Sequence, residues 1–183
     1  MTEYRTLMTE YRTLREEDID RELFRSFVRR QVVDLCLRLE NGEWVARHDP
    51  FIDDWSESDY QILVKCLRNT VRTGGYVCGA FSNGVLKGFV SVEKELFGGE
   101  NMYHDLTSIH VSQDMRRTGI GKELFMRAAA WAKDDGAKKL YISSHSAIES
   151  QAFYRAMGCV DAAERDLRHT SAEPYDRQLE YAL

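Results

Sequence analysis

The sequence predicts an α/β fold, because segments with the two-residue periodicity of strands alternate with segments that have the spacing of amphipathic helices. Two observations lead to this prediction. Two strand-like runs are joined by Asn83-Gly84, the dipeptide most typical of a tight hairpin. A third run ends at Val111 and continues through a basic, glycine-containing loop into a helix-like stretch.

In the N-terminal half, the first strand is expected at Tyr11–Leu14. Helices are expected at Asp18–Leu39 and at about Glu57–Thr73, ended by Asn41-Gly42 and Gly74-Gly75 respectively. The first helix is predicted from the spacing of its apolar side chains: Ile19, Leu23, Phe27, Val28, Val32, Leu35 and Leu39.

The C-terminal half continues the alternation of strands and helices. Strands are expected at Tyr76–Ser82, Val85–Glu95, Tyr103–Val111, Lys139–Ser144, Cys159–Glu164 and Arg177–Tyr181. Helices are expected at Glu123–Asp135 and Ile148–Met157, where Gly136 and Gly158 follow as stop signals.

The N-terminus begins with a duplication. Residues 1–7 and 8–14 are the same heptapeptide, Met-Thr-Glu-Tyr-Arg-Thr-Leu. A repeat this short cannot form a solenoid unit. Residues 1–7 are therefore interpreted as a duplicated start or a cloning scar, and residues 8–183 as one domain.

Composition limits the class of protein. The chain has 43% hydrophobic and 30% charged residues, and no apolar run long enough to span a membrane. A net charge of −5 gives no general attraction to nucleic acid. The four cysteines are scattered, which argues against a metal site and a disulfide framework and favours a cytoplasmic protein: Cys36, Cys66, Cys78 and Cys159.

The loop after Val111 has the composition of an anion-binding site. It reads Arg116-Arg117-Thr118-Gly119-Ile120-Gly121-Lys122 and opens a helix. Glycines let the backbone approach a phosphate, and the first helical N–H groups and the helix dipole favour its negative charge. The pattern Arg-x-x-Gly-x-Gly after a strand resembles the coenzyme-A-binding signature of the GNAT superfamily of N-acetyltransferases.

A second motif strengthens this resemblance. The segment Phe153-Tyr154-Arg155-Ala156-Met157-Gly158 is similar to the superfamily's Phe-Tyr-x-x-x-Gly segment. The resemblance covers nearly all of the chain from Met8. It implies the GNAT fold, a mixed and mostly antiparallel sheet of about seven strands flanked by about four helices.

The resemblance implies acetyl-CoA as co-substrate, no metal, and direct attack of an amine on the thioester. Backbone groups of Ile109, His110 and Val111 would bond the pantetheine arm. The loop residues would hold the pyrophosphate: Arg116, Arg117, Thr118, Gly119, Ile120, Gly121 and Lys122. For Arg117 and Lys122 a solvated surface charge is an equally good interpretation.

Tyr154 falls on the tyrosine of the family motif, which often protonates the departing thiolate. A phenol, with a pKa of about 10, is able to do this when it lies beside the sulfur. The alternative is an aromatic side chain that only packs in the core.

The general base is less well marked. Asp105 lies eleven residues before Arg116, where several GNAT enzymes place a base, and it is expected to share a face with Thr107 and Ile109. His104 and His110 are alternatives, because histidine titrates near neutrality.

The chain departs from the family pattern at one position. Ala147 stands where many relatives have an asparagine bonded to the coenzyme. Ser146 or Ser150 would then supply a hydroxyl, with Ser150 the candidate coenzyme contact.

The acceptor site is expected, by resemblance, among the first two helices, their loop and the last strands. Those segments contain Asp53, Asp54, Trp55, Glu57, Asp59, Tyr60, His169, Glu173, Tyr175 and Asp176. Carboxylates beside aromatic rings would hold a cationic amine. For most of these residues a helix N-cap cluster around Ser56 or Asp54 is the preferred interpretation.

We therefore expect an N-acetyltransferase acting on a small primary amine. The alternatives are a protein lysine or N-terminal acetyltransferase, a non-catalytic acyl-CoA-binding sensor, and an interaction domain that has lost the ligand. No nucleic acid or membrane partner is expected, and the resemblance allows a homodimer.

Overall fold

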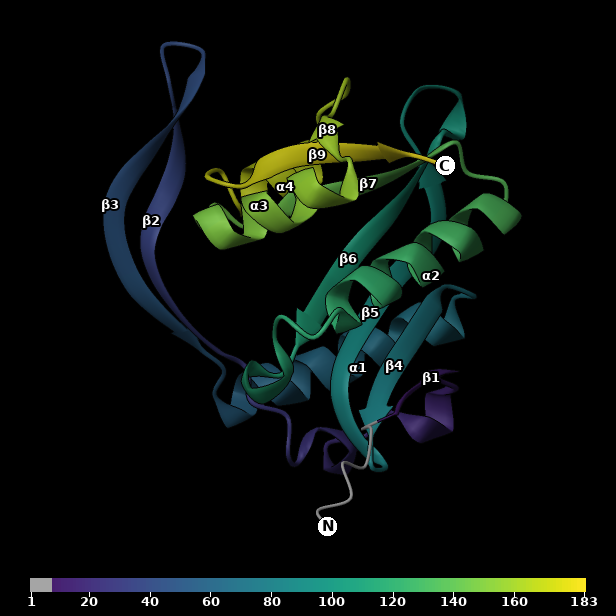
Figure 1. Cartoon of the computed structure of the whole chain (residues 1–183). Coiled ribbons are helices and arrows are strands. Elements are labelled where there is room, and N and C mark those ends of the chain that lie inside the picture. The colour runs from purple at the N-terminus through teal and green to yellow at the C-terminus, as the bar shows by residue number, and fades with distance from the viewer. Residues whose placement is uncertain (1–7) are drawn as a thin grey trace.

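The computed structural model describes residues 8–183. A seven-stranded sheet forms its centre, in the order β1-β4-β5-β6-β7-β9-β8, and β2 and β3 form a separate two-stranded sheet (Figure 1). The strands are β1 Thr9–Thr13, β2 Arg30–Glu40, β3 Glu43–Asp54, β4 Tyr76–Ser82, β5 Val85–Phe97, β6 Tyr103–Val111, β7 Lys139–Ser144, β8 Val160–Asp161 and β9 Arg177–Ala182. The helices are α1 Glu57–Arg72, α2 Ile120–Asp134, α3 Ile148–Met157 and α4 Leu167–Ala172.

The mixed, mostly antiparallel seven-stranded sheet confirms the predicted fold class. Every neighbouring pair in the large sheet is antiparallel except β6 and β7, which run parallel. The duplicated residues 1–7 lie outside the described part of the chain.

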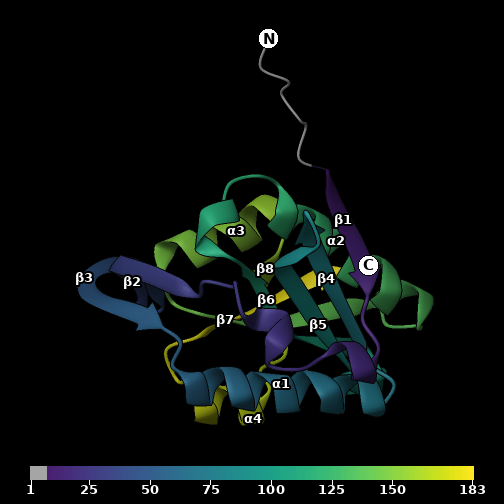
Figure 2. The ribbon, with the colours of Figure 1, turned by 90° about the horizontal axis from the view of Figure 1, so that it is seen from below.

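Helices cover both faces of the sheet. Figure 2 shows α1 and α4 on one face and α2 and α3 on the other. One apolar core lies between the sheet and α2, with Leu124 and Phe125 at its centre, and a second lies between the sheet and α1, with Leu67 and Phe89. The central strands are therefore buried on both faces. Because residues at the start of α2 belong to the first core, packing against the sheet holds this end of the helix near the end of β6.

The predicted helix at Asp18–Leu39 is wrong. The segment forms two short 3₁₀ helices, Glu16–Asp18 and Glu22–Phe24, followed by β2. Asn41-Gly42 does not end a helix but makes the β2–β3 hairpin turn, with φ of 51° and 86°. Positive φ at both central residues is the geometry that an Asn-Gly hairpin prefers. Val32, one of the apolar side chains whose spacing predicted the helix, is 60% exposed.

The β2–β3 hairpin extends beside the main sheet as an arm (Figure 1). It is tied to the β7–α3 connection, where the Leu37 amide donates to the Ser146 carbonyl at 2.8 Å. Val33 and Cys36 pack against Ala147 in a small apolar cluster. The hairpin therefore supports the start of α3 from outside the main sheet.

Two smaller differences concern the C-terminal third. The strand expected at Cys159–Glu164 is limited to the two residues of β8, and α4 was not predicted.

No helix in the described part of the chain is long and apolar enough to cross a bilayer.

Two irregularities interrupt the pairing of β5 with β6. Ser91 pairs with Ser108 and Val92 with Leu106, so Thr107 is an extra residue on β6. Further along, Leu96 pairs with His104, so that three β5 residues, 93–95, face Asp105 alone. Such bulges redirect side chains from one face of a sheet to the other.

Anchoring of α2 is expected to depend on Leu124, which is fully buried, and not on Met126, which is 43% exposed in the same helix. Leu124→Ala should lower the free energy of unfolding by about 2–5 kcal/mol, because it removes buried methyl groups and leaves a cavity. Met126→Ala should change it by less than about 1 kcal/mol. Chemical denaturation measures both values, and equal effects of the two variants would contradict this account of the core.

Candidate active site

The candidate site begins where β6 and β7 separate. The two strands pair only over Tyr103–Lys139, His104–Leu140 and Asp105–Tyr141, and then diverge (Figure 1). Along a strand, successive residues direct their N–H and C=O groups to opposite sides. From Leu106 to Val111, alternate peptide groups therefore face the side that β7 has left, where a ligand with amide groups can pair with them.

The basic loop lies at the end of this open edge. Arg117 has a φ of 64°, and Gly119, with a φ of 90°, is the N-cap of α2. The first-turn amides of a helix have no partners within the helix. Ile120, 2% exposed, anchors the turn in the core, so these amides are held in place at the surface.

Gly121 brings the two sequence motifs together. A Cβ added to it would lie 3.3 Å from the Phe153 ring and 3.6 Å from Val111. The end of β6, the start of α2 and the Phe-Tyr segment of α3 therefore meet at one residue that has little room for a side chain.

Arg116 and Arg29 both lie near the His110 side chain. The Arg116 Nε donates to the Val111 carbonyl at 3.4 Å, and Arg29 is buried with one nitrogen paired to Asp53. Burial and the two nearby arginines lower the pKa of His110 to about 3. The His110 ring packs edge-on against Trp55, and its low pKa makes it a poor base near neutrality.

Tyr154 is buried in the core and packs against Phe125 and Phe153. Its hydroxyl forms no hydrogen bond with another of the described residues. Burial raises the pKa of Tyr154, with smaller contributions from Cys159 and Asp176, and keeps the phenol protonated.

The two serine alternatives differ in their surroundings. Ser146 is buried, and its hydroxyl accepts a hydrogen bond from Arg38 of β2 at 2.9 Å. Ser150 is half-buried in the first turn of α3, and its hydroxyl has no partner among residues 8–183. Of the two, only Ser150 has a free hydroxyl beside the α3 N-terminus.

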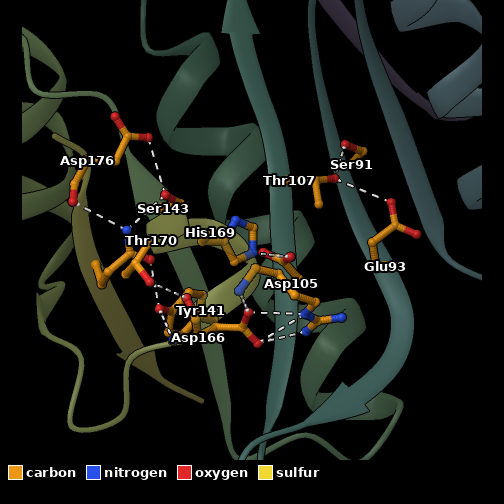
Figure 3. Close-up of polar contacts among 12 residues, drawn as sticks. Ser91, Glu93, Asp105, Thr107, Tyr141, Ser143, Asp166, His169, Thr170 and Asp176 are labelled. Atoms are coloured by element: carbon orange, nitrogen blue, oxygen red, sulfur yellow. Dashed lines mark hydrogen bonds and ion pairs between the residues drawn. The ribbon is translucent and has the colours of Figure 1, made fainter. Parts of the chain in front are cut away.

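Asp105 is bonded to His169 of α4, on the face of the sheet opposite α2. Figure 3 shows the two side chains pointing toward each other, with His169 Nε2 and Asp105 Oδ2 2.6 Å apart. A carboxylate partner fixes the proton on Nε2, so Nδ1 of neutral His169 is an acceptor. The hydrogen bond to Asp105 raises the pKa of His169, against the effect of burial.

The expectation that Asp105 shares a face with Ile109 is wrong. The extra residue Thr107 shifts the alternation by one, so Ile109 packs into the core beneath α2 while Asp105 faces α4. His104, the other predicted alternative, is fully buried and bonded to Asp135 at the end of α2.

The acids predicted as an N-cap cluster form one. Ser56 caps α1, and Asp59 completes a capping box with it. Glu57 is paired with Arg21, and Asp53 with Arg29. The cap is therefore confirmed for Ser56, Asp59 and the first-turn residue Glu57, whereas Asp53 lies in β3 and forms an ion pair away from the cap.

Sequence reasoning named His169 but did not connect it with Asp105, which lies 64 positions away. It also missed Glu93 and Glu95, which lie opposite Asp105 in the irregular part of β5. Two carboxylates two positions apart in a strand were a usable signal, since such residues share a face.

Comparison with known proteins agrees with this geometry. Residues 37–159 match the family model described as the acetyltransferase (GNAT) family. No protein of curated function matches the sequence.

Solved structures share the fold. A nourseothricin acetyltransferase has a TM-score of 0.67 and 20% identity, over 94% of this chain and 95% of that one. A putative streptothricin acetyltransferase from Bacillus anthracis str. Ames, in complex with acetyl coenzyme A, has a TM-score of 0.71 and 17% identity, over 97% and 98%. A PaiA N-acetyltransferase from Thermoplasma acidophilum, in complex with coenzyme A, has a TM-score of 0.60 and 14% identity, over 97% and 100%.

The pairing of His169 with Asp105 can be measured directly. Because the pKa of His169 is raised, the pair stabilises the fold fully below the ordinary histidine pKa of about 6.5 and loses this contribution as pH rises through the raised value. Asp105→Asn should lower the pKa of His169, followed by NMR titration of its ring protons. Asp161→Asn, which removes an exposed carboxylate bonded to Arg177, is the control. An unaltered His169 titration in Asp105→Asn would show that the pair is not formed.

Proposed function

The chain belongs to the GNAT acetyltransferase family, and we propose that it transfers the acetyl group of acetyl-CoA to a primary amine of a small molecule. The observation that carries this proposal is the open edge of β6, with the glycine loop and the α2 N-terminus at its end. Two proteins of similar structure are described as a nourseothricin acetyltransferase and a putative streptothricin acetyltransferase, which supports a small-molecule acceptor.

The residues of the loop fit an anionic coenzyme. A Cβ on Gly119 would meet nothing within 4 Å, the first-turn amides of α2 have no partners within the helix, and Arg117 and Lys122 add exposed positive charge beside them, with Arg116 at the end of β6. Thr118 and Ile120 fix the conformation of the loop. The Thr118 hydroxyl donates a hydrogen bond to the Met115 carbonyl, and the Ile120 side chain is buried in the core. Ile109, His110 and Val111 would offer backbone groups to the pantetheine arm, and Ser150 a hydroxyl from α3.

Acetyl-CoA supplies an activated acetyl thioester, and the acceptor must present a neutral amine to it. We assign removal of the amine proton to the Asp105–His169 pair. Asp105 holds the Nε2–H of His169, and Nδ1, which has no partner among the described residues, accepts the proton directly or through water. Because the pKa of His169 is raised, its neutral form increases as pH rises above the ordinary histidine range.

We assign protonation of the leaving thiolate to Tyr154. Its raised pKa keeps the hydroxyl protonated at neutral pH, and the absence of a partner within residues 8–183 leaves it free to donate. Packing against Phe125 and Phe153 fixes the ring, so that the position of the oxygen is set before the reaction.

The coenzyme site is tested by a matched pair of glycine variants. Gly119 and Gly136 lie at opposite ends of α2, both have positive φ, of 90° and 97°, and a Cβ on either would meet nothing within 4 Å. Gly119→Glu and Gly136→Glu therefore introduce similar backbone strain, but only the first places a carboxylate at the proposed phosphate site. Gly119→Glu should weaken acetyl-CoA binding by about tenfold or more in calorimetry. Equal affinities of the two variants would refute the assignment.

The reaction itself is tested by thiol release from acetyl-CoA across a panel of amines, with mass spectrometry of the products. Tyr154→Phe should lower kcat by about a hundredfold and affect KM little. Tyr181→Phe is the control, because Tyr181 also packs against Phe125. Turnover only with protein lysines or α-amines would favour a protein acetyltransferase, and acetyl-CoA binding without turnover on any amine would favour a sensor.

A further inference from the structure

A cavity of about 340 Å³ lies beside Asp105, on the face of the sheet opposite α2. It is lined by the end of α1, the irregular part of β5, and Arg168 of α4, and its lining residues are Asn69, Thr73, Glu93, Lys94, Glu95, Phe97, Asp105 and Arg168. The cavity lies where β5 leaves the regular ladder, with residues 93–95 opposite Asp105 alone.

Two cationic side chains line this cavity, and each is paired with an aspartate outside it, although the Arg168 charge also acts on Glu95 and Asp105. Lys94 is paired with Asp135, and Arg168 with Asp166. Glu93 accepts hydrogen bonds only from hydroxyls, at 2.6 Å from Thr70 and at 3.5 Å from Thr107, the second of which Figure 3 shows. Within residues 8–183, neither Glu93 nor Glu95 forms an ion pair.

Asp105 adds an unsatisfied acceptor to the same place. The residue as a whole is 8% exposed, and while Oδ2 is bonded to His169, Oδ1 is buried without a partner among the described residues. A buried carboxylate oxygen without a donor is costly, and like charges facing each other across strands are destabilising. A bound cation with several N–H donors would remove both costs.

We propose that this cavity binds a second, positively charged ammonium group of the acceptor, so that the substrate is a diamine or a larger polyamine. The inference rests on the proposed function for the reacting amine. That amine is neutral and lies near His169, while the other remains an ammonium and is held by Glu95, Glu93 and Asp105 Oδ1.

The binding experiment compares two ligands of similar length on the protein saturated with coenzyme A. Diaminobutane carries two ammonium groups and butylamine carries one. Calorimetry should show diaminobutane binding about tenfold or more tightly, since a charge-assisted hydrogen bond in a partly buried site gives a difference of that order. Glu95→Gln should remove most of this preference. Glu43→Gln, an exposed glutamate at the far end of the hairpin, is the control and should keep it.

The kinetic experiment uses the same ligands and variants. With active protein, kcat/KM for diaminobutane should exceed that for butylamine by about tenfold or more, and Glu95→Gln should reduce the ratio. If no amine is acetylated, the proposed function fails. The difference in calorimetric affinity between diaminobutane and butylamine then still tests whether the cavity binds an ammonium group. Equal binding of the two amines, or a preference that survives in Glu95→Gln, would overturn the inference.

Discussion

The short pairing between β6 and β7 is the constraint on which the rest of the structure depends. Two parallel strands that pair over three residues and then diverge leave peptide groups of β6 without strand partners. Such groups must be satisfied by solvent or by a ligand. The same divergence determines where the next two helices begin, because α2 follows the end of β6 and α3 follows the end of β7. Gly121 and Phe153 then meet across the opening, so its width at that end is fixed by packing.

Backbone register, more than side-chain identity, decides which residues face which side of β6. The extra residue at Thr107 places Ile109 in the core under α2 and leaves Asp105 on the opposite face, bonded to His169. The second irregularity moves Glu93 and Glu95 out of the regular ladder, opposite Asp105. A one-residue change of register reverses the face of every following side chain. The proposed coenzyme contacts and the proposed acceptor contacts are thereby separated on a single strand.

The sequence predicted what is encoded locally and failed where distant segments decide. The glycine loop, the start of α2 and the Phe-Tyr segment each lie within a few residues, and their helices were expected close to their observed bounds. The wrong helix at Asp18–Leu39 had two causes. Asn41-Gly42 is compatible with a helix end as well as with a hairpin turn, and the spacing of the apolar residues fitted both the helical period and the two-residue period of a strand. Val32-Val33 and the alternation of Leu35, Leu37 and Leu39 favoured a strand. The Asp105–His169 bond joins residues far apart in sequence and depends on a bulge, so no local pattern predicted it.

Charge is arranged along β6 in a way that the net charge of the chain does not reveal. Arg116, Arg117 and Lys122 follow its C-terminal end, while Asp105, Glu93 and Glu95 lie toward its start. The six residue steps from Asp105 to Val111 span roughly 20 Å at the rise of a strand. This is about twice the distance over which exposed charges act at physiological salt. The two fields therefore do not cancel, and each acts on its own ligand. The basic loop attracts the polyanionic donor, and the acidic cavity repels it. The cavity attracts a cationic acceptor, and the loop repels that acceptor. Each proposed substrate is therefore kept out of the binding site of the other substrate.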